Sequence, residues 1–401
     1  MVGAGVFAAF GPAAAAAGTG LLIGLAIAAV VAYANATSSA DLAARYPSSG
    51  GTYVYGRERL GRFWGDLAGG AFVVGKAASC AGMALTAGAA VSEEWSRPIA
   101  VAAIVVITAV NHRGIRKTVL VTRVLVTVVL TVLALVVAAS LLGGQADATN
   151  LVDTGHGGVA GVLQSAGLLF FAFAGYARIA TLGEEVEHPA TTIPKAIPRA
   201  LGITLAVYAA VAVAALAAVG PSALAASSAP LATAVASGRF AALEPAVRAG
   251  AVVASLGVLL SLVAGVSRTL FAMAADGVVP RALAAVHPRH QVPHRADLVV
   301  GAAVTALVCV TDLRHAIGFS SFCVLTYYAI ANAAALTLPP YERRWPRRLA
   351  VVGVVGCVVL AVALPVRTAV VGAGVVVAIA LAVEVRAARG DPPAPPRGPA
   401  S

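Results

Sequence analysis

The stretch from Gly158 to Ile197 reads GVAGVLQSAGLLFFAFAGYARIATLGEEVEHPATTIPKAI, and its character changes along its length. The first part, Gly158–Leu182, is almost entirely apolar and carries one charge, Arg178. A helix of that length can cross the ~30 Å of hydrocarbon in a bilayer. A glycine-containing segment, Phe170–Tyr176, interrupts this apolar run, and an acidic, proline-containing segment follows it. The stretch therefore predicts a broken membrane-spanning helix that runs into a polar loop.

The composition places the rest of the chain in lipid as well. Of its 401 residues, 60% are apolar and only 11% are charged, and the mean hydropathy is +0.90. Soluble domains have about 45–50% apolar and about 25% charged residues. The runs lack the short polar–apolar alternation of membrane β-strands. The fold class is therefore an all-α integral membrane protein.

Apolar runs of suitable length recur along the chain, and we expect about 12 transmembrane helices. The predicted spans are Val2–Ala17, Leu21–Ala36, Trp64–Val91, Pro98–Val110, Val119–Leu142, Gly158–Leu182, Leu201–Val219, Ala249–Ala275, Leu298–Thr311, Ile317–Leu338, Leu349–Pro365 and Ala369–Val385. Together they form one transmembrane domain, residues 1–385. The proline-rich remainder, 386–401, is expected to be a disordered cytoplasmic tail.

The basic residues support this assignment and orient the chain. Of the 28 lysines and arginines, 21 fall in one set of alternate loops, the span ends beside them and the tail. Five fall in the other set, and only Lys76 and Arg178 lie deep within spans. Positive charge is enriched on the cytoplasmic side of membrane proteins. We therefore predict a multi-pass plasma-membrane protein whose C-terminus is cytoplasmic. The net charge of +11 follows from this bias rather than from nucleic-acid binding, because the aromatic content is only 6%.

The first span is unusual. Met1–Ala17 would reach only ~25 Å as a helix, and no basic residue precedes it although an even number of spans puts the N-terminus in the cytoplasm. We therefore expect a truncated first helix and a reading frame that continues about 20–40 codons upstream of Met1, enough for a short lead and half a helix.

Two spans have glycine clusters where a transporter would break its helices: Gly3-Ala4-Gly5-Val6-Phe7 and Phe170–Tyr176. A break inside the membrane is tolerated where the freed N–H and C=O groups face a cavity or a ligand. The N–H end suits a carboxylate, and the C=O end suits an ammonium group or a cation. The alternative is that these small residues serve helix packing, as small residues commonly do in membranes.

Four motifs in order resemble the amino acid permeases of the APC (amino acid–polyamine–organocation) superfamily. They are Ala34–Gly61 after the second span, Asn111–Arg116 after the fourth, the broken span Phe170–Ile197, and the segment from Ser267 to Pro280. The resemblance covers Met1–Val385. It implies a LeuT-like five-plus-five inverted repeat, with repeat one at about 1–142 and repeat two at about 158–338. Two extra C-terminal helices would occupy about 349–385.

The resemblance also implies a substrate site. Gly3, Ala4 and Gly5 match the unwound first helix, whose amides hold the substrate carboxylate in the family. Phe171, Ala172, Phe173 and Gly175 match the sixth-helix segment that receives the amino group and closes an aromatic lid. Packing is the alternative role for the phenylalanines, and Glu184, Glu185 and Glu187 are more consistent with loop-stabilising charges than with substrate ligands.

The chain departs from the family at one charged position. Many members carry a lysine in the fifth helix where a cation would otherwise bind, and the matching position here is about Val129. Lys76, by contrast, lies near the middle of the third span. An ammonium costs ~2.5–3.5 kcal/mol there, so it is a functional candidate by default. Two hypotheses stand side by side. In the first, Lys76 takes the place of a bound cation near the broken helices or couples transport to protons. In the second, it ties its ammonium to carbonyls freed by the broken helices.

Other chemistry finds little support in the residues. His287, His290 and His294 lie in HPRHQVPH, whose spacing could suit a metal, but the prolines and arginines favour a solvated basic loop. The four cysteines lie in apolar runs without paired spacing, which favours neither disulfides nor a metal site. We expect no enzyme and no cofactor. The preferred function is secondary active transport of amino acids, with an exchanger or exporter as one alternative and a channel or receptor as another. No acidic residue near the broken helices would pair with a cationic side chain, which favours neutral or anionic amino acids.

Overall fold

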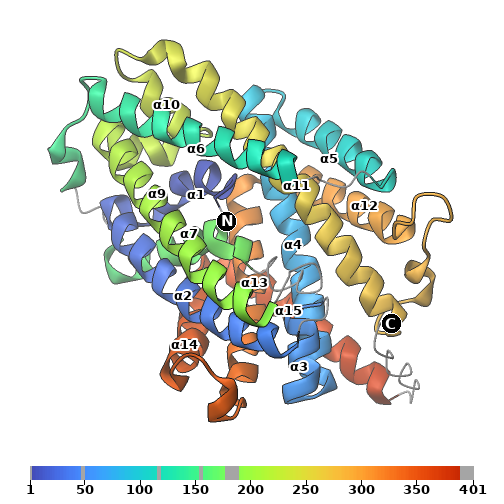
Figure 1. Cartoon of the computed structure of the whole chain (residues 1–401). Helices are drawn as coiled ribbons and strands as arrows, with labels where there is room; N and C mark the ends of the chain where they lie inside the picture. The colour runs from blue at the N-terminus through green and yellow to red at the C-terminus, as the bar shows by residue number, and fades with distance from the viewer. Residues whose placement is uncertain (1, 47–49, 115–118, 153–156, 177–188, 389–401) are drawn as a thin grey trace.

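A computed structural model of the protein describes residues 2–46, 50–114, 119–152, 157–176 and 189–388. Within these ranges the chain forms α-helices, short 3₁₀ turns and loops, with no β-strand (Figure 1). The helices are α1 (Gly5–Ala17), α2 (Leu21–Arg45), α3 (Thr52–Leu60), α4 (Arg62–Val91), α5 (Ser96–His112), α6 (Val119–Leu142), α7 (Gly158–Phe173), α9 (Pro189–Ala226), α10 (Pro230–Ala236), α11 (Glu244–Ala275), α12 (His294–Val310), α13 (Leu313–Leu336), α14 (Arg347–Ala363) and α15 (Val366–Ala388).

The all-helical fold class is confirmed for the described residues. Seven of their helical stretches are long and apolar enough to cross a membrane, and the first of these contains both α1 and α2. Two shorter helices, α5 and α7, are also apolar. The predicted number of 12 spans and the inverted repeat remain expectations.

Several helices extend beyond the apolar runs that predicted them. α2 continues through polar residues to Arg45, and α3 forms inside a segment predicted to be a connection. α9 begins at Pro189 and kinks at Gly220, where φ is 70° and ψ is 171°. Hydropathy identifies only the apolar part of a helix, so the polar ends of a helix fall outside the spans that it predicts. The short α10 is mostly buried.

α4 lies at the centre of the bundle and packs against α3, α5, α11 and α13 (Figure 1). Small residues allow this close packing. At Gly75, for example, an added Cβ atom would lie 2.6 Å from the Cβ atom of Cys323 on α13. The outer helices α6 and α15 are different, since they are rich in valine and leave much of their apolar surface exposed. Lipid would cover such faces.

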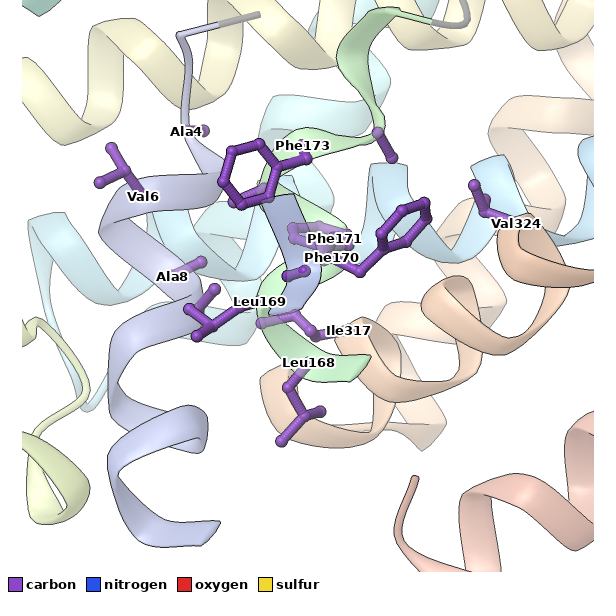
Figure 2. Packing of buried hydrophobic residues seen from close by; sticks show 14 of the residues in the cluster. Ala4, Val6, Ala8, Leu168, Leu169, Phe170, Phe171, Phe173, Ile317 and Val324 are labelled. Carbon is purple, nitrogen blue, oxygen red and sulfur yellow. The ribbon is translucent and has the colours of Figure 1, made fainter. Parts of the chain in front are cut away.

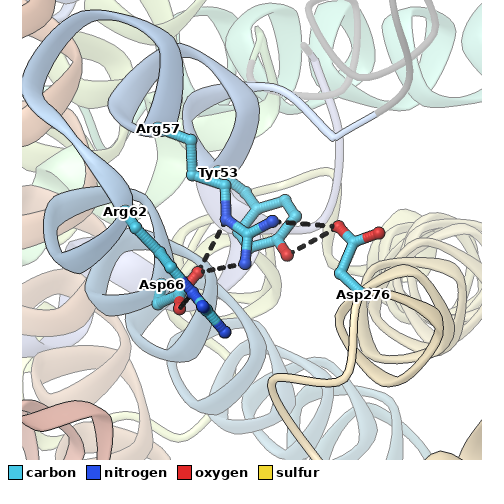
Figure 3. Close-up of polar contacts among 5 residues, drawn as sticks. All are labelled: Tyr53, Arg57, Arg62, Asp66 and Asp276. Carbon is cyan, nitrogen blue, oxygen red and sulfur yellow. Dashed lines mark hydrogen bonds and ion pairs between the residues drawn. The ribbon is translucent and has the colours of Figure 1, made fainter. Parts of the chain in front are cut away.

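Charged residues join α3, α4 and the end of α11 (Figure 3). Arg57 on α3 contacts the buried carboxylate of Asp66 at 2.7 Å and the carboxylate of Asp276 at 3.3 Å. The hydroxyl of Tyr53 also donates to Asp276, at 2.7 Å. This network lies at the end of the bundle that the charge distribution predicts to be cytoplasmic. There it links α3 to α4 and to the end of α11.

Candidate functional site

A cavity of about 480 Å³ lies between the start of α1, the end of α7 and the helices α4, α6 and α11. Most of its lining is apolar. Its described lining residues include one charged side chain, Lys76, and no acidic one. The cavity can therefore accommodate a largely apolar molecule beside a single cation.

The start of α1 faces this cavity through Val2, Gly3, Ala4 and Gly5. The α-helix begins at Gly5, and the backbone N–H of Phe7 donates to Ala4 O at 3.0 Å. The other N–H groups of a first helical turn have no partner within the helix, and this end carries the positive part of the helix dipole. The arrangement suits a carboxylate.

The end of α7 faces the same cavity from the other side. α7 ends at Phe173, and Ala174–Tyr176 form a 3₁₀ turn, so the helix ends within the predicted glycine segment. Phe171, Ala172, Ala174 and Gly175 line the cavity. Carbonyl groups at a helix end carry the negative part of the dipole and suit a cation.

The two helix ends touch through their backbones at Gly5. A Cβ atom added to Gly5 would lie 2.7 Å from Ala172 Cα and 3.0 Å from Ala172 Cβ. Side chains essentially never approach backbone this closely, so only glycine fits here. The close contact brings an N–H-rich helix end and a C=O-rich helix end to one wall of the cavity.

Tyr208 on α9 ties these two ends together. Its hydroxyl donates to Ala172 O at 3.2 Å, and the backbone of Gly3 is a second hydrogen-bond partner of the same side chain. Sequence reasoning missed Tyr208, because a tyrosine within an apolar helix gives no signal that separates a structural hydrogen bond from packing.

Lys76 reaches the helix break from α4. Its Nζ atom donates to Ala174 O at 3.2 Å, and its side chain is buried. Val129, which the family resemblance matches to a lysine in other members, lines the same cavity from α6. An ammonium group is thus present at the cavity, but a different helix supplies it.

The three phenylalanines of α7 have different surroundings (Figure 2). Phe171 lines the cavity and is 8% exposed. Phe170 packs against Tyr328 with ring centroids 5.9 Å apart, and Phe173 packs against Tyr208 at 5.3 Å. Of the three, Phe171 alone could cover a ligand in the cavity.

The structure therefore brings most of the predicted site residues to one place. Gly3, Ala4, Gly5, Phe171, Ala172, Gly175 and Lys76 all line the cavity. Phe173 lies beside it, against Tyr208. Arg178, Glu184, Glu185 and Glu187 lie outside the described residues. No three histidine, cysteine, aspartate or glutamate side chains in the described ranges are placed to share a metal ion.

Comparison with known proteins agrees with these features. Residues 1–383 match the model of a family described as amino acid permease. An uncharacterized transporter of Mycobacterium tuberculosis is 61% identical over 365 residues, which cover 91% of this chain and 83% of that protein. The branched-chain amino acid permease of Bacillus subtilis is 26% identical, with coverage of 88% and 81%. The human cationic amino acid transporter 4 is 27% identical, with coverage of 84% and 57%.

The family model extends over nearly the whole chain and includes both helix ends that form the cavity wall. The resemblance seen in the motifs is confirmed: this chain belongs to the amino acid permease family of the APC superfamily.

Proposed function

We propose that this protein is a secondary active transporter that carries neutral amino acids across the plasma membrane by alternating access. The fold would be a five-plus-five inverted repeat followed by two further helices. The observation that carries the proposal is the meeting of the α1 start and the α7 end on one cavity wall. One end offers N–H groups and the other offers C=O groups, which is the pair of partners that a zwitterion needs.

The substrate would bind with its carboxylate at the backbone of Gly3, Ala4 and Gly5. Its amino group would lie at the carbonyl end of α7, and its side chain would extend under Phe171 into the apolar part of the cavity. Two carbonyls at this end already have donors, Tyr208 and Lys76. The substrate ammonium would therefore have to share or displace the contact of Lys76 with Ala174 O.

Neutral amino acids suit the mainly apolar lining of the cavity. Lys76 would repel a cationic side chain, and no described carboxylate in the lining would offset that repulsion. A screen of the twenty amino acids for thermal stabilisation of the purified protein tests this point, since a bound ligand raises the thermal midpoint. We expect stabilisation by apolar neutral amino acids. Stabilisation by lysine or arginine alone would contradict the proposed substrate class.

Lys76 is also the proposed coupling group. A buried lysine can release and regain a proton, and its contact with Ala174 O places any change of charge beside the substrate ammonium. The Lys76→Met variant should still exchange substrate but should no longer be accelerated by an inward proton gradient. Lys195→Met removes an exposed lysine on α9 and serves as the control.

The outcome for Lys76 separates coupling from a structural role. A variant that keeps the full response to the proton gradient would refute coupling through Lys76. If the variant also had a lower thermal midpoint, the contact with Ala174 would be structural.

Counterflow separates a carrier from a channel. Proteoliposomes loaded with unlabelled amino acid should transiently accumulate the labelled amino acid, because only a carrier exchanges substrate for substrate. Flux that follows the concentration gradient without accumulation would favour a channel. Counterflow that persists while an imposed proton gradient drives no net uptake would favour an exchanger.

A further inference from the structure

Four histidines from three elements gather at the end of the bundle that the charge distribution predicts to be cytoplasmic. His112 ends α5, His287 and His290 lie in the connection after α11, and His294 begins α12. The ring of His287 lies 4.7 Å from that of His290, 5.4 Å from that of His112 and 5.5 Å from that of His294, measured between centroids. We call these four residues the histidine cluster.

Local hydrogen bonds hold the connection between α11 and α12 in a compact turn around His287 and His290. The N–H of His287 donates to Val292 O at 2.8 Å, and Gln291 has a φ of 53°. The Nδ1 atom of His287 accepts from the backbone N–H groups of Arg289 and His290, both at 3.2 Å. The connection also lies against the end of α5, since a Cβ atom on Gly114 would be 2.9 Å from His290 O.

The charges around the histidine cluster oppose the binding of several protons. Arg289 on the connection and Arg268 on α11 are positive, and each protonated imidazole would repel the others. The carboxylate of Asp297 on α12 acts in the opposite sense, and it interacts with His112, His294 and Arg268. Asp297 therefore offsets part of the positive charge around the histidine cluster.

The surroundings of three of the imidazole rings disfavour the protonated form. Burial lowers the pKa of His287, and His290, His112, His294 and Arg289 lower it further. The Nδ1 atoms of His112 and His294 are buried and have no hydrogen-bond partner among the described residues. Both ring nitrogens of an imidazolium are donors, so in a charged ring this Nδ1 atom would be a buried donor without an acceptor, which costs free energy.

The histidine cluster also connects to the wall of the cavity. Asn111 precedes His112 and donates from Nδ2 to Leu260 O on α11, at 3.4 Å. The next residue of α11, Ser261, lines the cavity. α12 packs on α5 closely as well, because a Cβ atom on Gly301 would lie 2.7 Å from Thr108 Oγ1. A shift of the α5 end would thus reach α11.

We infer that the histidine cluster is a proton-sensitive latch, which holds the ends of α5 and α12 and their connection together when neutral and loosens when it takes up several protons. The imidazoles are not placed to share a metal ion in the described geometry, and the proposed ligand is the proton. Acidification on this side would then disturb the cavity wall and slow transport, a consequence that rests on the proposed function.

The pKa of His287 determines how the stability of the folded protein changes with pH. An unfolded histidine has a pKa of ~6.5, and His287 has a lower pKa in the folded protein. The folded state then binds fewer protons than the unfolded state. The contribution of His287 to the free energy of unfolding is therefore fully present above pH ~6.5 and is lost as the pH falls below that value.

The test is the thermal midpoint of the purified, substrate-free protein between pH 7.5 and 5.5. The double variant His287→Asn/His290→Asn removes two ionisable rings, and the amide oxygen introduced at position 287 can still accept the two backbone hydrogen bonds. His315→Asn is the control, because His315 pairs with Asp312 at the start of α13. We expect the midpoint to fall with acid in the wild type and the control, and to fall less than half as much in the double variant.

An equal fall in all three proteins would overturn the inference, and so would a flat wild-type profile. Zn²⁺ that raises the wild-type midpoint but not that of the double variant would also overturn it, in favour of a metal site. If the double variant does not fold, hydrogen exchange of residues 285–296 in the wild type decides: it should rise at pH 5.5 after correction for intrinsic rates, and no rise would overturn the inference. These readouts need no substrate, so a failure of the proposed transport function would leave them unaffected.

Discussion

The contact between Gly5 and Ala172 gives a sharp test of the site, through the single substitution Gly5→Ala. The added Cβ atom would lie 2.7 Å from Ala172 Cα, whereas carbon atoms pack best at ~3.5–4.0 Å. The two helix ends would therefore have to separate by about 1 Å. Overpacking of this kind costs roughly 1–3 kcal/mol. Because the same two ends would hold the carboxylate and the amino group, their separation should weaken binding. A loss of the same 1–3 kcal/mol from the binding free energy would lower amino acid affinity by about 5- to 150-fold.

A second cavity-lining glycine provides the matched control for Gly5→Ala. Gly265 on α11 also lines the cavity, but a Cβ atom there would meet nothing within 4 Å. Gly265→Ala should therefore bind substrate within a few-fold of the wild type. The assay is equilibrium binding of a labelled neutral amino acid to the purified variants. Equal affinity of Gly5→Ala and Gly265→Ala would refute the role of the α1–α7 contact.

Three further predictions concern the aromatic lining, the charged network and the topology. Phe171→Ala should impair transport more than Phe170→Ala, because Phe171 lines the cavity and Phe170 packs on Tyr328; equal, small effects would favour packing for both. Arg57→Met should lower the free energy of unfolding by roughly 3–5 kcal/mol, since it removes the nearest cation from the buried carboxylate of Asp66. Arg62→Met should cost about 0–1 kcal/mol, because the Arg62 side chain is 43% exposed and lies 3.5 Å from Asp66. Single cysteines at positions 57, 116, 290 and 344 should resist an impermeant thiol reagent in intact cells, and labelling at two or more would contradict the predicted orientation.

The main features of the site could be predicted from sequence because helix breaks depend on local chemistry. Glycine clusters marked the start of α1 and the end of α7, and the hydropathy of the third span marked Lys76. The partner of Lys76 could not be identified in this way, because Ala174 O is a backbone atom on another helix.

Features that depend on tertiary packing gave no such signal. Tyr208 is separated from its partner Ala172 by 36 positions, and His112 lies far along the chain from HPRHQVPH, which alone suggested a solvated loop. Phe171 and Phe173 were both expected at the substrate. Side chains two positions apart on a helix point about 200° apart, so the orientation that puts Phe171 in the cavity turns Phe173 toward Tyr208.

A cryo-electron-microscopy structure with a saturating neutral amino acid would test the proposed binding site most directly. We expect the substrate carboxylate at the backbone of Gly3–Gly5, the amino group at the end of α7, and the side chain under Phe171. Substrate bound elsewhere, with the cavity between α1 and α7 empty, would contradict the proposed site.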